Sequence, residues 1–86
     1  MQVELRLFAN LRRYLPSGGD GTKATLDVPE GTRLVDLFER LNIPPQLAQL
    51  VMVNGVHEPN RERPLSDGDA ISIFPPVAGG GRRVED

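Results

Sequence analysis

The chain has 86 residues, ten Lys+Arg against twelve Asp+Glu, a formal net charge of −2 and no cysteine. This length allows one domain, and the balanced charge argues against a nucleic-acid-binding protein, which usually has a basic excess. The lack of cysteine excludes disulfides, thiolate nucleophiles and cysteine-bound metals. Because MQVELRLFAN contains no long apolar run, we expect no signal peptide, no membrane span and a cytoplasmic location.

Two strands are predicted near the start of the chain. Residues 3–8, VELRLF, alternate aliphatic with other side chains, which is the pattern of a half-buried strand. Residues 15–21, LPSGGDG, are rich in turn formers and predict an exposed loop. Residues 24–29, ATLDVP, predict a second short strand. We expect the two strands to form a hairpin with a long tip.

A helix is predicted after this hairpin. Four apolar residues are spaced at i, i+3, i+4 and i+7, which places them on one helical face. They are Leu34, Leu37, Phe38 and Leu41. Thr32 is a suitable N-cap, and Asn42 followed by Pro44 and Pro45 is expected to end the helix.

The second half of the chain predicts a hairpin and a last strand. Asn54-Gly55 lies between apolar residues in 51–58, a strong hairpin signal, and AISIF, residues 70–74, predicts the final strand. A right-handed crossover would place this strand beside the first and parallel to it. The expected fold class is α+β: a β-grasp (ubiquitin-like) roll, with a mixed sheet of four to five strands and one main helix packed on one face.

The chain ends in FPPVAGGGRRVED. We divide it into a β-grasp domain over residues 1–76 and a flexible tail over residues 77–86. Pro75 and Pro76 fix φ near −65° and stiffen the root of this tail. The run Gly79–Gly81 has no side chains and makes a thin, bendable thread.

The segment LSDGDAISIFPPVAGG resembles the C-terminal signature of the MoaD/ThiS family of small ubiquitin-like sulfur carriers, and most of all its MoaD members. LFANLRRYL and VNGV are similar to the first strand with its turn and to the middle hairpin of that family, so the resemblance spans residues 1–80. It implies that an E1-like enzyme uses ATP to adenylate the carboxylate of Gly80, next to Gly79, and that sulfur then displaces AMP to leave a thiocarboxylate. The root of the tail would be Pro75, Pro76, Val77 and Ala78.

The resemblance also implies partners. They are the E1-like adenylating enzyme, a sulfur donor and a MoaE-like large subunit of molybdopterin synthase, in which sulfur passes to a pterin precursor. The protein would then be a cosubstrate and not an enzyme, with no bound cofactor or metal. The residues agree, since His57 has no second ligand at metal spacing, and turn chemistry accounts for Asp67 near Asp69.

The chain departs from the family pattern at its end. Family carriers usually end at the second glycine, which corresponds to Gly80, whereas this chain continues through residues 81–86. Gly80 therefore has no free carboxylate in the full chain. We expect a peptidase, such as one of the JAMM type, to cut between Gly80 and Gly81. The alternatives are cleavage after Gly81 and a retained tail.

An aromatic residue lies near the end of each of two strands that are expected to be neighbours. Phe8 and Phe74 sit on the strand faces opposite to the aliphatic residues, and parallel pairing would bring both close to the root of the tail. An exposed apolar patch there would suit partner docking, with Leu11 and Val77 at its rim. The alternative is that loop residues cover both rings as a small second core.

Other functions stay open at this point. A ubiquitin-like modifier would use the same adenylate but join Gly80 to a lysine of a target. The single lysine, Lys23 in the predicted loop, makes long chains of such a modifier on itself unfavourable. Carriers for thiamine, cysteine or tRNA thiolation share the terminal chemistry. A regulatory β-grasp module would use only its sheet face and would need no terminal glycines.

Overall fold

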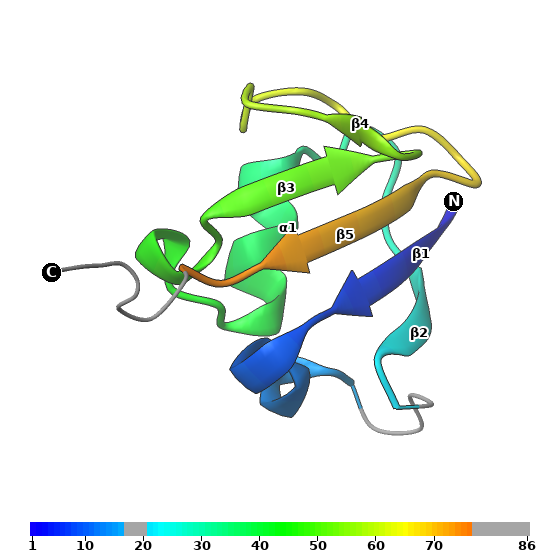
Figure 1. Cartoon of the computed structure of the whole chain (residues 1–86). Coiled ribbons are helices and arrows are strands. Elements are labelled where there is room, and N and C mark those ends of the chain that lie inside the picture. The colour runs from blue at the N-terminus through cyan, green and yellow to red at the C-terminus, as the bar shows by residue number, and fades with distance from the viewer. Residues whose placement is uncertain (17–20, 77–86) are drawn as a thin grey trace, which may run out of the picture.

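The computed structural model describes residues 1–16 and 21–76. Five strands form one sheet in the order β2-β1-β5-β3-β4, and the main helix packs on one face of it (Figure 1). The strands are β1 (Gln2–Leu7), β2 (Lys23–Asp27), β3 (Leu50–Val53), β4 (Val56–His57) and β5 (Ala70–Phe74). The helix is α1 (Leu34–Leu41), and two short 3-10 helices are η1 (Ala9–Tyr14) and η2 (Pro45–Leu47). The central β5 is parallel to β1 and antiparallel to β3, which confirms the β-grasp prediction.

The core lies between the sheet and α1. The alternation in β1 buries Val3, Leu5 and Leu7, and β5 contributes Ile71 and Ile73 in the same way. The four residues that predicted the helical face are all buried. Together β1, β5 and α1 supply most of the core residues. Each fully buried aliphatic or aromatic side chain stabilises the fold by about 1.5–3 kcal/mol.

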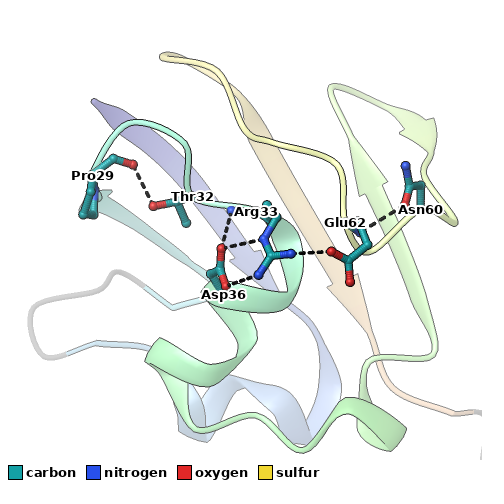
Figure 2. A network of polar contacts seen from close by, with 6 residues as sticks. All are labelled: Pro29, Thr32, Arg33, Asp36, Asn60 and Glu62. Carbon is teal, nitrogen blue, oxygen red and sulfur yellow. Dashed lines mark hydrogen bonds and ion pairs between the residues drawn. The ribbon is translucent and has the colours of Figure 1, made fainter.

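The start of α1 differs from the prediction. Arg33, and not Thr32, occupies the N-cap position. The Thr32 hydroxyl instead donates to the Pro29 carbonyl at 2.7 Å, which closes the preceding turn. The Asp36 carboxylate accepts the main-chain N–H of Arg33 at 2.9 Å. Figure 2 shows the Arg33 guanidinium lying between the carboxylates of Asp36 and Glu62.

A segment distant in sequence also satisfies the first turn of α1. Residues 61–65 run past the start of the helix, and the main-chain N–H groups of Leu34 and Val35 donate to the carbonyls of Arg63 and Arg61 at 3.2 and 2.9 Å. The first N–H groups of a helix have no partner inside it. This segment supplies partners, and it therefore fixes where α1 begins.

The other turns follow the predicted chemistry. Asn54 and Gly55 have φ values of 54° and 82°, as the two central residues of a type I′ hairpin turn require. Asn42 adopts the left-handed conformation, with φ 62°, and ends α1. Lys23, which the prediction placed in a loop, is the first residue of β2.

Candidate functional site

Two aromatic rings stack at the end of the sheet where β1 and β5 finish. The ring centroids of Phe8 and Phe74 are 4.3 Å apart, and the ring planes differ by 6°. Leu7 pairs with Ile73 in the parallel register, so the next residue of each chain segment brings the two rings to the same face. The Phe8 N–H also donates to the Ile73 carbonyl at 3.3 Å. Both side chains are half-buried, so the stack retains surface that solvent can reach.

A third apolar side chain belongs to this surface and was missed from the sequence. Leu50 of β3 pairs with Phe74 in the antiparallel register, and directly opposed residues point to the same face. Its side chain is 37% exposed, although it is large and aliphatic. The alternation in LVMV, where Val51 and Val53 are buried, is the signal that could have placed Leu50 outward. We call Phe8, Leu50 and Phe74 the aromatic patch.

Leu11 does not belong to the aromatic patch, contrary to the prediction. It lies in η1, is 0% exposed and packs in the core. The Leu11 N–H donates to the Phe8 carbonyl at 3.1 Å, so the chain turns back immediately after β1 and points this residue inward. Because η1 follows β1 almost directly, Leu11 lies in the core under the sheet and not at the rim of the aromatic patch.

The root of the tail leaves the sheet beside this patch. The Phe74 carbonyl accepts the Gln49 N–H at 3.0 Å, and the chain then enters Pro75 and Pro76, of which the second is exposed. Proline has no N–H to continue the strand, so β5 ends here. The remaining predicted site residues lie outside the described part of the chain. They are Val77, Ala78, Gly79, Gly80 and Gly81.

The titratable residues form no metal centre in residues 1–16 and 21–76, where no group of three His, Asp or Glu side chains is arranged to hold an ion. His57 is exposed on β4. Asp67 accepts the main-chain N–H of Gln2 at 2.7 Å. This contact gives Asp67 a structural role in the turn. The Asp69 side chain, in the same turn, is also held by hydrogen bonds.

Asp69 is a buried carboxylate whose importance the sequence did not reveal. Its side chain accepts from the Asn54 amide at 2.9 Å, the Ser66 N–H at 2.8 Å and the Arg63 guanidinium at 3.3 Å. Burial by itself would raise the pKa of Asp69, but the Ser66, Asn54 and Arg63 donors outweigh burial and hold the pKa below its ordinary value of 3.8. Asn54 returns a bond by accepting the Ala70 N–H at 2.9 Å, so this cluster fixes the start of β5.

A protein-family model matches most of this chain. The model of the ThiS family matches residues 5–80. The chain belongs to the ThiS family. This match confirms the resemblance to ubiquitin-like sulfur carriers, and it ends at Gly80, so residues 81–86 lie beyond the part that the family model covers. Comparison with curated protein sequences gave no significant match.

Solved structures with the same fold agree with this ThiS-family assignment. A protein described as molybdopterin converting factor subunit 1 from Pyrococcus furiosus is 26% identical, with 88% of this chain and 98% of that chain covered and a TM-score of 0.64. In a complex of subunits 1 and 2 of molybdopterin-converting factor from Helicobacter pylori, the matching chain is 27% identical, with 93% and 100% covered and a TM-score of 0.57. SAMP1 from Haloferax volcanii shares the fold at 23% identity, with 93% and 100% covered and a TM-score of 0.66.

The helices of the ThiS-family domain are short. In the part of the chain that the structure describes, no helix is both long and apolar enough to cross a membrane.

Proposed function

We propose that this protein carries sulfur as a thiocarboxylate on Gly80, after residues 81–86 have been removed, and delivers it to a pterin precursor of the molybdenum cofactor. The observation that carries the proposal is that the family match ends at Gly80, the second glycine of the sequence PPVAGG that follows Phe74. One neighbour described as subunit 1 of molybdopterin converting factor, and another from a complex of subunits 1 and 2 of such a factor, support the choice of pathway.

The proposed chemistry acts on the main chain and needs no side-chain nucleophile of this protein. A carboxylate is a poor electrophile, so one Gly80 oxygen first attacks the α-phosphate of ATP and releases pyrophosphate. Hydrosulfide then attacks the acyl carbon and expels AMP, and loss of its proton leaves the thiocarboxylate. An E1-like enzyme would bind ATP, a separate donor would supply the sulfur, and this chain would be the cosubstrate. Because glycine has no side chain, the tail would fit narrow, water-excluding sites on the E1-like enzyme and on the large subunit that accepts the sulfur.

The aromatic patch gives the proposed carrier a docking surface at the root of its thread. Contiguous apolar patches, and not single exposed apolar residues, mark interaction sites, and Phe8, Leu50 and Phe74 gather where β5 ends. A partner that binds this patch would receive the thread at a fixed position. The Helicobacter pylori neighbour was solved with subunit 2, and we propose a MoaE-like large subunit as the equivalent partner here.

The deciding experiment is the intact mass of the protein isolated from its own host. A species that ends at Gly80, heavier by the difference between sulfur and oxygen, is the expected result. A species that ends at Gly80 only in covalent linkage to lysines of other proteins would instead identify a modifier. Full-length protein under every growth condition would overturn the use of Gly80 as a terminus.

A reconstituted assay separates processing from activation. The chain that ends at Gly80 should support ATP–pyrophosphate exchange by the cognate E1-like enzyme, whereas the full chain should not. The control ends at Ala78 and keeps the entire described domain. Exchange by this control would show that the glycines are not the site.

A further inference from the structure

The edge of the sheet formed by β2 carries main-chain groups without a strand partner. β2 pairs with β1 on one side only. The Thr22 carbonyl accepts the Leu7 N–H, and the Val28 N–H donates to the Met1 carbonyl, at 2.9 Å each. Main-chain groups alternate in direction along a strand. The N–H and C=O groups of residues 23, 25 and 27 therefore point away from the sheet. Among the residues described, one bond reaches these groups, from Arg40 Nη2 to the Asp27 carbonyl at 3.4 Å.

The side chains of this strand are complementary to themselves. In an antiparallel pair of two β2 strands with the two-fold axis at Thr25, Lys23 of each copy lies opposite Asp27 of the other. On the face toward α1, where the side chains are half-buried, Ala24 lies opposite Leu26. The sequence KATLD thus gives an opposite-charge pair, an apolar pair and a threonine pair in one register. Such cross-strand pairs each contribute roughly 0.2–1 kcal/mol.

We propose that two copies of this chain associate through their β2 edges to form one continuous antiparallel sheet. Residues 23, 25 and 27, whose main-chain groups point outward, lie opposite one another in this two-fold register. The hydrogen bonds and the charge pairs therefore favour the same alignment. This interface goes beyond the proposed carrier function. It does not use the aromatic patch, since none of Phe8, Leu50 and Phe74 belongs to β2.

Charged residues on an edge strand usually prevent pairing, and here they disfavour the parallel arrangement. A parallel pair would place Lys23 beside Lys23 and Asp27 beside Asp27, and like charges in direct opposition are destabilising. The antiparallel register turns the same charges into two attractive pairs. The opposite edge offers no equivalent, because β4 has only two residues. The contact is small, so we expect a weak, reversible dimer.

The first test is the concentration dependence of amide chemical shifts in the full chain, from micromolar to millimolar protein. Shifts that follow a monomer–dimer isotherm and centre on residues 23–27 are expected. Sedimentation velocity at the same concentrations should show a matching rise in mean mass. Concentration-independent shifts over this range would overturn the proposal, and so would shifts centred on the aromatic patch.

Charge exchange gives the sharper test. Lys23→Asp and Asp27→Lys each put like charges opposite one another in the dimer, and each should weaken self-association at least tenfold. An equimolar mixture of the two variants restores both attractive pairs across the interface and should associate at least as well as the original chain. Both substitutions lie on exposed positions. Lys23→Asp also removes the 3.9 Å contact between Lys23 Nζ and the Glu4 carboxylate, so circular dichroism of each variant is the control for a retained fold. A mixture that associates no better than either variant alone would rule out this register.

Discussion

The rings of Phe8 and Phe74 lie face to face with centroids 4.3 Å apart, at the point where the chain leaves the sheet toward its glycines. Neither residue belongs to the core between the sheet and α1. Stacked aromatic pairs contribute about 0.5–1.5 kcal/mol beyond the area that they bury, so the stack also holds the end of β5 against β1. The same pair thus anchors the root of the tail, and we propose that it also contacts the partner that receives the tail.

Replacement of Phe74 by Ser should weaken binding to a MoaE-like large subunit by about 2 kcal/mol, roughly 30-fold, because buried aromatic anchors dominate interfaces. Isothermal titration calorimetry with the purified subunit measures this effect. The control is Val56→Ser, which changes a side chain that is 68% exposed on β4 and should leave the affinity unchanged. Equal losses for the two variants would show that the aromatic patch has no special role.

Leu11 and Leu50 should separate stability from docking. Leu11→Ala removes a fully buried side chain and should cost about 2–5 kcal/mol of unfolding free energy in a urea titration. Leu50→Ala changes an outward side chain and should alter the unfolding free energy by about 0.5 kcal/mol or less. It should, however, weaken binding of the large subunit. If Leu11→Ala strongly weakened binding of the large subunit at temperatures where this variant is folded, the prediction that Leu11 lines the aromatic patch would be restored.

Elements with a strong periodic pattern could be predicted from the sequence, because the pattern reports the surface that must be buried. The apolar spacing of α1 and the alternation of β1 and β5 are of this kind. Asn54-Gly55 is equally informative, since few residues adopt its conformation. η1 was missed because Leu11 is the only buried residue in it, and a single apolar residue in a polar segment carries no periodicity.

Features that depend on distant contacts could not be predicted. The choice between Thr32 and Arg33 as the N-cap of α1 is made by Asp36 and by Glu62, which lies 29 residues after Arg33. Asp69 reads as an ordinary turn residue, yet the Asn54 amide and the Arg63 guanidinium converge on it. The aromatic pair could be placed by strand parity alone, but the exposure of Leu50 beside it depends on which elements cover the outer face.

Asp36→Asn should lower the melting temperature by a few degrees at neutral pH. Hydrogen bonds from the Arg33 side chain and main chain hold the pKa of Asp36 below its ordinary value of 3.8. Its contribution to stability is therefore complete above that value and is lost as pH falls through the lower pKa of the folded state. The difference between the two proteins should shrink in acid. The control Glu39→Gln, at an exposed position of the same helix, should show little change at either pH.

Asp69→Asn should be the most damaging change to a charged residue of this domain. Asp69 is 5% exposed and its carboxylate accepts from three donors, whereas an amide offers one acceptor oxygen and adds donors of its own. A buried donor left without a partner costs about 1–3 kcal/mol, and we expect a loss in this range at neutral pH. Thermal and urea denaturation would measure it, with Asp67→Asn as the control, because an amide oxygen can still accept the Gln2 N–H.

The acid dependence of this loss has a definite sign. The donors around Asp69 hold its pKa below 3.8 in the folded protein despite burial, so unfolding takes up a proton when the pH lies between the folded and unfolded values. The stability that Asp69 contributes is constant above the unfolded value and falls as pH drops through the folded one. The difference in unfolding free energy between the original chain and Asp69→Asn should therefore be constant near neutral pH and become smaller below about pH 4. A gap that widens in acid would mean that the carboxyl is protonated in the folded state, and the three donors would then need another explanation.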